Sequence, residues 1–301
     1  MESIRTNKLC YKIGDKVILD DIDLEVPRGS VYGYLGRNGA GKSTTIKLLL
    51  GLLASKHDNI FIQDRSLKSH PTAIHSLTGN LIEAPCFYNK LTVFENLKYL
   101  DLIYGQGTER IEEVLELVDL HREKKKQASS LSMGMKQRLG IAMAIYHDPE
   151  LLILDEPLNG LDPQGIFEMR KLFQSLNEQG KTIFLSSHIL SELERVATHI
   201  GIIEGGKLIF QGTKRNLLKE VKRAVVLKIS SAESATELLT SKDFSVSLDD
   251  SNAIRVEIAS DQQLNELFKI LVLNGIDIYA VESFGADLEQ IFMNLISQAN
   301  D

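Results

Sequence analysis

Residues 36–44 of the chain read Gly36-Arg37-Asn38-Gly39-Ala40-Gly41-Lys42-Ser43-Thr44. The spacing of these residues is typical of a loop whose backbone N–H groups surround phosphate oxygens, with the lysine reaching the terminal phosphates and the serine hydroxyl on Mg²⁺. Residues 31–35 before it favour a β-strand, and residues 42–53 carry apolar side chains at helical spacing. A bound anion would then lie at a helix N-terminus. The sequence therefore predicts a nucleotide-binding α/β fold rather than a glycine-rich turn without a ligand.

Further elements are predicted on both sides of this loop. After the loop, residues 92–129 follow a helical pattern, with Ile111, Val114, Leu115 and Val118 on one face. We expect these residues to form a small helical subdomain inserted in the nucleotide-binding fold. The predicted strands are residues 4–13, 17–26, 31–35, 59–63 and 77–83.

Two carboxylates follow a run of four aliphatic residues. Residues 151–154 have the composition of a buried parallel strand, and Asp155 and Glu156 come directly after it. Carboxylates at such a strand end suit two tasks, so we expect Asp155 to bind Mg²⁺ and Glu156 to polarise a water molecule. His188 follows another predicted strand, 182–185. A histidine at a strand end is a weak signal alone, but its order after the other motifs favours a catalytic role.

Composition limits the classes of protein that this chain can be. The 301 residues suggest two domains, and the longest apolar stretches fall short of the roughly 18 residues that a membrane span needs. Cys10 and Cys86 show no disulfide or metal spacing, and the N-terminus has no signal-peptide core, so we expect a cytoplasmic protein. Residues 221–301 hold 6 Lys/Arg against 13 Asp/Glu, which argues against a nucleic-acid surface.

The C-terminal part, residues 221–301, is predicted to be a separate accessory domain. Its pattern is strand, helix, strand, strand, helix, strand and a last helix over 287–299, which suggests a small α+β module of the ferredoxin-like type. The pattern contains no catalytic constellation. Dimerisation or regulation is one interpretation of this domain, and plain stabilisation of the chain is the alternative. The earlier predicted elements are strand 224–230, helix 232–241, strands 244–249 and 253–259, helix 261–274 and strand 276–283.

These motifs, in this order, resemble the ATP-binding cassette (ABC) family over about residues 1–220, with a helical subdomain at about 84–150. The resemblance implies a P-loop NTPase with a RecA-like core and an N-terminal antiparallel β subdomain. It also implies ATP and Mg²⁺ as ligands. By resemblance, Glu156 is the catalytic glutamate and His188 the switch histidine. The other implied site residues are the phosphate-loop residues Gly36, Asn38, Gly39, Gly41, Lys42, Ser43 and Thr44, the signature-loop residues Ser132 and Gly134, Asp155 of Walker B, and Asp162 of the D-loop.

The resemblance also implies partners. ABC cassettes work as head-to-tail pairs, so Ser132 and Gly134 of one subunit are expected to complete the ATP site of the other. A homodimer is the simplest such pair. The pair is expected to drive a separate membrane permease, which places this chain at the cytoplasmic face of the cell membrane without a span of its own or a nucleic-acid partner.

Three positions depart from the family pattern. The aromatic residue that stacks on adenine is replaced by Ile13, with Tyr11 two residues earlier on the same strand face, so either residue is a candidate for the adenine contact. The signature loop has Met133 and Met135 where glycine and glutamine are usual. We expect the retained Gly134 to allow a close backbone approach.

The third departure is Glu83, which stands where most of the family has a glutamine that senses Mg²⁺ and the attacking water. The string from Leu81 to Leu97 resembles the bacitracin-resistance and lantibiotic-immunity branch, whose cassettes energise export of membrane-active peptide antibiotics. A carboxylate beside a triphosphate is repelled unless a metal compensates, so Glu83 is expected to contact Mg²⁺. Neutral drift at a tolerant site is the alternative. Phe87, Tyr88 and Phe94 follow, either as core residues or as contacts for the membrane subunit.

A soluble ABC ATPase that acts as a mechanical switch in translation or DNA maintenance is the alternative function. The translation type carries two cassettes in one chain, and the chromosome type inserts a long coiled coil between the Walker motifs. This chain has one cassette and about 112 residues between Lys42 and Asp155. We therefore favour an ATPase that powers an exporter of a peptide antibiotic or another amphiphilic substrate.

Overall fold

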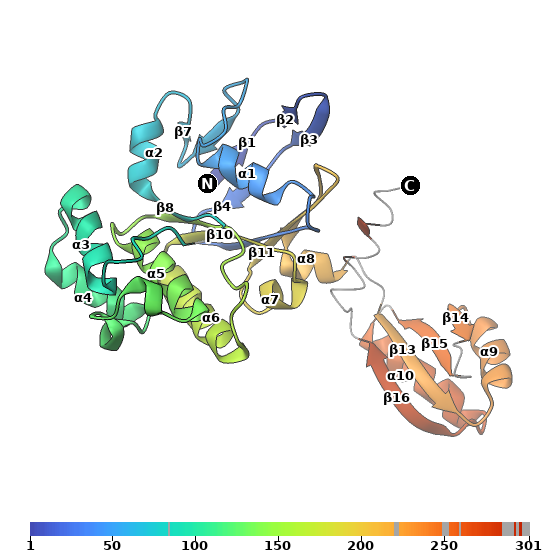
Figure 1. Ribbon diagram of the computed structural model, residues 1–301. Helices are drawn as coiled ribbons and strands as arrows, with labels where there is room; N and C mark the ends of the chain where they lie inside the picture. Colours follow the sequence, from blue (N-terminus) through green and yellow to red (C-terminus); the bar gives the residue numbers. More distant parts are fainter. Residues whose placement is uncertain are drawn as a thin grey trace. The chain divides into compact units, whose positions relative to one another are not determined.

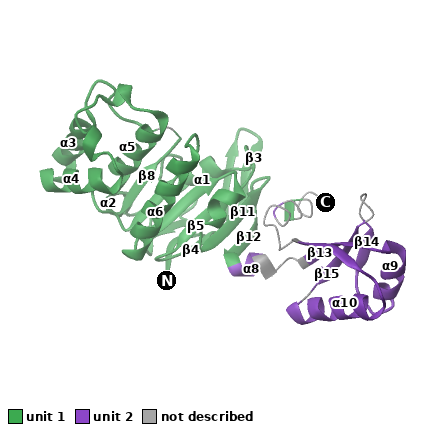
Figure 2. Cartoon of the chain, turned by 90° about the horizontal axis from the view of Figure 1, so that it is seen from below, with its two compact units in different colours: residues 1–214, 295–301 green, residues 215–294 purple. Residues whose placement is uncertain are grey.

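The structure, a computed structural model, describes residues 1–83, 85–219, 223–248, 253–258, 260–284, 292 and 295–296. The chain divides into two compact units, residues 1–214 with 295–301 and residues 215–294 (Figure 2). In the described residues, the first unit contains three sheets and the second contains one, and each unit has its own buried apolar core. The division follows residue 214, whereas the predicted boundary follows residue 220.

A six-stranded sheet forms the centre of the first unit (Figure 1). Its order is β12-β11-β5-β10-β9-β8, and neighbouring strands are parallel except for the antiparallel pair β11 and β12. β5 and β9 are buried along their whole length, as expected for strands covered on both faces. The bounds are β5 Val31–Leu35, β8 Thr78–Leu81, β9 Leu151–Leu154, β10 Thr182–Ser187, β11 His199–Glu204 and β12 Lys207–Thr213.

Helices connect these parallel strands. α1 (Lys42–Leu49) follows β5, α6 (Pro163–Glu178) joins β9 to β10, and α7 (Leu190–Glu194) joins β10 to β11. Gly51 has a φ of 69°, and this left-handed turn takes the chain out of the helical path just after α1. The expectation that the helix reaches Leu53 is therefore wrong, and Leu53 packs half-buried against the core beyond the helix end.

The residues before the phosphate loop form strands, but each long strand predicted there is broken in two. Thr6 lies at the first break, where its hydroxyl donates to the Ile22 carbonyl (2.7 Å) and accepts from the Leu24 N–H (2.9 Å). These side-chain bonds replace strand pairing where the chain passes from one sheet to another. β1 (Glu2–Thr6) and β4 (Glu25–Pro27) join a four-stranded sheet with β6 (Ile60–Ile62) and β7 (Arg65–Ser66), whereas β2 (Leu9–Ile13) and β3 (Lys16–Ile22) form a separate hairpin.

One short helix precedes β8 and was not predicted. α2 (Pro71–Leu77) begins with a proline at its first turn, a position that proline favours because its missing N–H has no helical partner there. The predicted strand 77–83 is wrong at both ends, since Leu77 closes α2 and the strand stops at Leu81.

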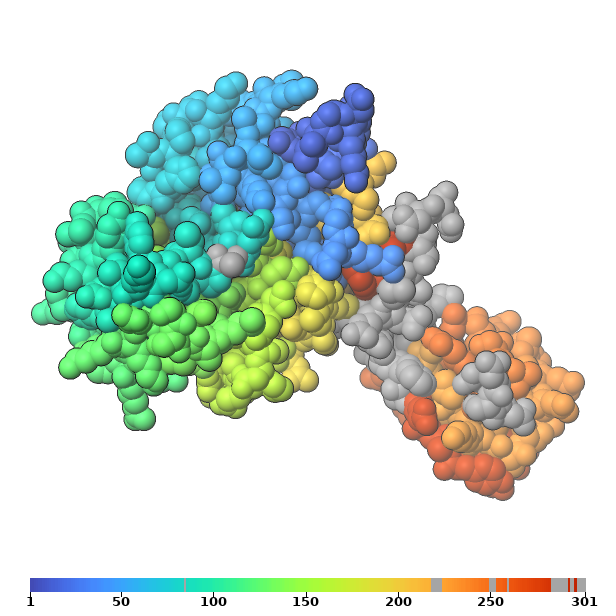
Figure 3. All heavy atoms as spheres, viewed as in Figure 1, coloured from blue at the N-terminus to red at the C-terminus, as the bar shows by residue number. Residues whose placement is uncertain are grey.

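The helical subdomain lies between β8 and β9, at one end of the first unit, with the N-terminal strands at the other end (Figure 3). Thr92 and Glu95 form a capping box at its first helix. The four apolar residues predicted to share a face, Ile111 to Val118, are all buried. The elements are α3 Val93–Tyr104, α4 Thr108–Leu117, the 3₁₀ turns η1 His121–Glu123 and η2 Ala128–Ser130, and α5 Met133–Ile145.

The second unit is a four-stranded antiparallel sheet in the order β14-β15-β13-β16. Its core contains Leu239 of α9 and Leu267 and Leu271 of α10. The predicted helix over 287–299 falls almost wholly outside the described residues. After α8 (Lys214–Lys219), the elements are β13 Arg223–Ile229, α9 Ala232–Thr240, β14 Val246–Leu248, β15 Ile254–Ile258, α10 Asp261–Leu273 and β16 Ile278–Phe284.

Candidate active site

The phosphate loop has the strand, loop and helix order that its sequence predicts. β5 ends at Leu35 and α1 begins at Lys42. Two of its glycines are required by their surroundings. A Cβ at Gly36 would lie 2.6 Å from the Ile203 carbonyl oxygen, and Gly41 has a φ of 116° with Leu19 2.6 Å from the position of a Cβ. The loop therefore keeps a shape that bulkier residues would distort.

Lys42 lies folded over this loop. Its side chain is only 6% exposed, and Nζ donates to the Gly36 carbonyl (2.8 Å) and the Arg37 carbonyl (3.4 Å). Nζ also lies 3.3 Å from Oε1 of Glu156. The loop thus holds a buried positive charge where a phosphate would bind.

The two predicted carboxylates lie at the end of β9 and share one partner. Ser186, in β10, donates its hydroxyl to Oδ1 of Asp155 (2.6 Å) and accepts from the Glu156 N–H (2.9 Å). Glu156 has a φ of 50°, a left-handed conformation that a glutamate adopts only when its surroundings hold it. Sequence reasoning did not single out Ser186. Its place directly before Ser187-His188 at a strand end was the available signal.

His188 contacts the same glutamate. Its Nδ1 lies 2.9 Å from Oε2 of Glu156, a distance at which a protonated Nδ1 donates a hydrogen bond. The carboxylate of Glu156 therefore contacts both Lys42 of the phosphate loop and His188, the residue after β10. Three residues predicted from separate motifs, Lys42, Glu156 and His188, form one contiguous cluster.

Glu83 lies elsewhere, on the flank of α1. Its side chain is 66% exposed, its φ is 56°, and Oε1 accepts a 2.8 Å hydrogen bond from Nζ of Lys47. This contact lowers the pKa of Glu83 and raises the pKa of Lys47. The contact of Lys47 with Glu83 was not predicted from the sequence, although Lys47 stands five positions after Lys42 on the same helix.

A groove of about 800 Å³ adjoins both glutamates. Glu83, Glu156, Phe87, Met133 and Gln137 are among the residues that line it. Of the three aromatic residues noted in the sequence, Phe87 and Phe94 are half-buried and Tyr88 is exposed.

The signature and D-loop residues border a different hollow. Ser132 caps α5 by accepting from the Met135 N–H (3.3 Å), and Asp162 caps α6 by accepting from the Gly165 N–H (2.8 Å). Ser132, Gly134 and Asp162 line one hollow of about 380 Å³. Lys42, Glu156 and His188 are not among the residues that line this hollow.

The two candidates for the adenine contact differ in exposure. Ile13, at the end of β2, is 62% exposed, whereas Tyr11 is half-buried and packs against the core of the first unit. Ile13 therefore exposes more of its apolar side chain to a ligand than Tyr11 does.

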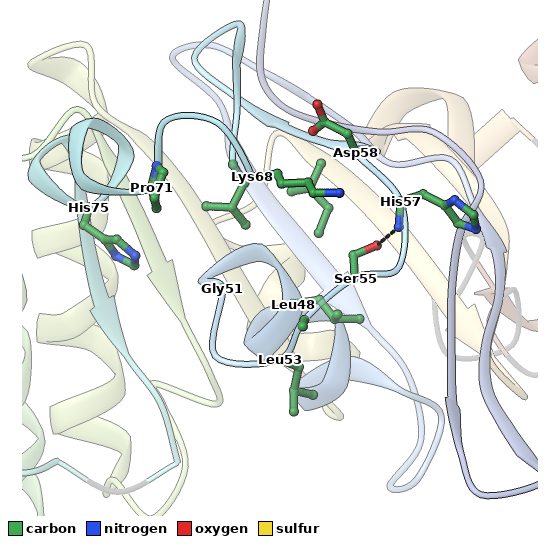
Figure 4. Close-up of a pocket in the computed structure, with 12 residues that line it drawn as sticks. Leu48, Gly51, Leu53, Ser55, His57, Asp58, Lys68, Pro71 and His75 are labelled. Carbon is green, nitrogen blue, oxygen red and sulfur yellow. Dashed lines mark hydrogen bonds between the residues drawn. The ribbon is translucent and has the colours of Figure 1, made fainter.

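A further hollow of about 310 Å³ lies beyond the C-terminal end of α1 (Figure 4). Apolar residues such as Leu48 and Leu53 form its wall, and the Ser55 hydroxyl accepts from the His57 N–H (3.4 Å) beside it. None of the predicted site residues lines it.

Comparison with known proteins places the chain in a family. The family described as ABC transporter matches residues 19–159. The "Bacitracin transport ATP-binding protein BcrA" of Bacillus licheniformis is 42% identical over 299 residues, which cover 97% of each chain. This chain belongs to the ABC transporter family. The "Lantibiotic transport ATP-binding protein SrtF" of Streptococcus pyogenes is 39% identical over 69% of this chain and 90% of its own length.

A solved "ATP binding subunit of ABC transporter" aligns with this ABC protein at a TM-score of 0.66 and 30% identity, over 72% of this chain and 92% of that one. The resemblance inferred from the motifs is thus confirmed. The chain is an ATP-binding subunit and an ATPase of an ABC transporter, and such a subunit implies a permease partner. In the residues that the structure describes, no helix is both long enough and apolar enough to cross a bilayer.

Proposed function

We propose that this ABC subunit hydrolyses ATP with Glu156 as the general base. The observation that carries the proposal is the position of the Glu156 carboxylate between Lys42 (3.3 Å) and His188 (2.9 Å). Incoming phosphates offer Lys42 a stronger anionic partner, which frees one oxygen of Glu156 to accept a proton from water. His188 holds the other oxygen and so keeps the carboxylate oriented during this step.

Mg²⁺ is the metal that we propose for this site. The Ser43 hydroxyl and the buried Asp155 carboxylate are oxygen ligands of the kind that Mg²⁺ takes beside nucleotide phosphates. Among the described residues, no group of three or more His, Cys, Asp or Glu could hold a metal unaided, so phosphates and water are needed to complete the set. When bound, the ion neutralises charge on the phosphates. Glu83 is a further candidate ligand if it leaves Lys47.

The complete site is proposed to need a second copy of the chain. Ser132, Gly134 and Asp162 border one hollow, apart from the phosphate loop, so a head-to-tail homodimer would bring that hollow to the partner's nucleotide. The N–H groups at the start of α5 suit a γ-phosphate. Within the loop, Asn38, Gly39 and Thr44 are proposed to face the phosphates together with Gly36 and Gly41.

The transported substrate is proposed to be a peptide antibiotic. The relatives named above are a bacitracin and a lantibiotic transport protein, and the first matches this chain over nearly its full length. We place the subunit at the cytoplasmic face of the cell membrane, beside a permease that binds the substrate. Residues 1–220 are proposed as the cassette and residues 221–301 as an accessory domain.

The accessory domain is proposed to be ferredoxin-like. Its order β13-α9-β14-β15-α10-β16, with an antiparallel sheet in the order β14-β15-β13-β16, supports that assignment. Dimerisation or regulation is the role that we propose for it.

A complementation experiment tests this function. In a strain that lacks the gene, the wild-type chain should restore resistance to a panel of bacitracin and lantibiotics, and it should co-purify with a polytopic membrane protein. The Lys42→Met variant should co-purify equally well but restore no resistance. Recovery with ribosomes or DNA instead of a membrane protein would contradict a transport role.

A further inference from the structure

Two lysines of α1 each hold one glutamate. Lys42 pairs with Glu156 after β9 (3.3 Å), and Lys47 pairs with Glu83, which follows the neighbouring strand β8 (2.8 Å). Both glutamates have left-handed backbone conformations, with φ values of 50° and 56°. Such conformations in non-glycine residues persist only where the surroundings hold them, and they concentrate at functional sites.

The two pairs differ in their exposure to water. Lys42 and Glu156 are 6% and 21% exposed, whereas Lys47 and Glu83 are 35% and 66% exposed. An ion pair as exposed as Lys47 and Glu83 is weak and easily separated. Glu83 is therefore held in place but can leave α1 at little cost.

We propose that Lys47 is a positioning residue that holds Glu83 against α1 in the nucleotide-free subunit and releases it when Mg²⁺ and ATP bind. The proposal rests on the proposed function, because it assigns a regulator to the same site.

The charge of a bound Mg²⁺ ion explains why Lys47 would release Glu83. The Asp155 N–H donates to the Leu81 carbonyl (2.7 Å), so Asp155 and Glu83 follow neighbouring strands at the same edge of the sheet. A divalent cation at Asp155 would attract the Glu83 carboxylate and repel the Lys47 ammonium. Both effects favour separation of Lys47 and Glu83.

The groove beside Glu83 supplies a reporter of this change. Cys86, an exposed free cysteine three residues after Glu83, lines the same groove of about 800 Å³. Because Glu83 and Cys86 line the same groove, a change in the position of the Glu83 side chain changes the surroundings of the Cys86 thiol. The rate at which the Cys86 thiol reacts therefore reports whether Glu83 is held by Lys47.

The experiment uses the full chain with Cys10→Ser, so that Cys86 is its single thiol. Alkylation by neutral iodoacetamide is followed without nucleotide in four proteins: the parent, Lys47→Met, Glu83→Gln and the double variant. Each single variant should react roughly twofold to fivefold faster than the parent, the range expected for loss of a weak surface pair. The double variant should react no faster than either single one. Saturating Mg²⁺ and ATP should speed the parent and leave the variants unchanged.

The two single variants change the local charge in opposite directions, so they distinguish release of Glu83 from a direct electrostatic effect of the lost charge on the reactivity of the Cys86 thiol. Lys47→Met makes the surroundings of Cys86 more negative and Glu83→Gln makes them less negative, so a field effect would move the two rates in opposite directions. Lys125→Met, a change at an exposed lysine of the helical subdomain, is the control and should match the parent.

Unchanged rates in both single variants, rates that move in opposite directions, or additive effects in the double variant would overturn the proposal. The nucleotide-free comparison does not depend on hydrolysis. A parent protein that neither binds nor hydrolyses ATP would instead contradict the proposed function, so the two failures are distinguishable.

Discussion

Nζ of Lys42 lies 3.3 Å from Oε1 of Glu156, so the cation of the phosphate loop and the proposed base neutralise each other before nucleotide binds. The pair is almost buried, and His188 holds the second oxygen of the same carboxylate. We therefore expect that ATP separates Lys42 from Glu156 when its phosphates enter the loop, which would free the proposed base.

Lys42→Met should weaken ATP binding by at least about tenfold, because a hydrogen bond to a charged group contributes roughly 1.5–3 kcal/mol. Titration calorimetry with Mg²⁺ and ATP measures this change. Lys125→Met is the control and should bind ATP as the wild type does. Wild-type affinity in Lys42→Met would rule out the role of the lysine.

Ile13→Tyr should tighten ATP binding. Ile13 is 62% exposed, and an aromatic ring at that position can stack on adenine, a contact worth about 1–3 kcal/mol or roughly fivefold and more in affinity. Leu52→Tyr, at a residue that is 60% exposed and lies beyond α1, is the matched control and should leave affinity unchanged. Equal affinities for Ile13→Tyr and the wild type would show that the adenine lies elsewhere.

Much of the phosphate site could be predicted from the sequence because its residues follow strand ends. The run of aliphatic residues at 151–154 is typical of a buried parallel strand, and the end of that strand determines where Asp155 and Glu156 lie. The Ser132 cap could also be predicted, since a serine before a helix has a local reason to be there.

Contacts that join distant segments could not be predicted. Lys47 lies on α1, which follows β5, whereas Glu83 follows β8, and two strands separate β5 from β8 in the sheet, so no local pattern indicates that the two side chains meet. The broken N-terminal strands were missed for a similar reason, since the Thr6 hydrogen bonds that end β1 reach Ile22 and Leu24. The helix α2 lacked a clear apolar period, with Ile74 as its one buried residue.

Gly79→Ala should destabilise the first unit by about 1–3 kcal/mol, because a Cβ at this position in β8 would collide with the backbone carbonyl of Ala144. Urea unfolding measures the loss. Gly134→Ala is the control, since the nearest atom to its Cβ would be Leu161 Cδ2 at 3.5 Å. Equal midpoints for the two variants would contradict the tight packing of β8 on α5.

Stability should fall in mild acid partly through His147. This ring stacks on Tyr104 (4.5 Å between centroids), and burial lowers its pKa in the folded protein. The unfolded chain binds a proton near the ordinary pKa of about 6.5, whereas the folded chain resists it, so the stability is present above that pH and is lost as the pH falls. His147→Phe keeps the stacking and should lose less stability than the wild type between about pH 7.5 and pH 5. Parallel losses in the two proteins would contradict this assignment.

Glu156 as the base of a site shared by two copies of the chain is tested by the mass in solution and the ATP turnover of Glu156→Gln with saturating Mg²⁺ and ATP. We expect a stable dimer with almost no turnover. Ser132→Ala in the same chain should weaken that dimer. A Glu156→Gln protein that hydrolyses ATP at nearly the wild-type rate, or that stays monomeric with ATP bound, would show that Glu156 is not the base of a shared site.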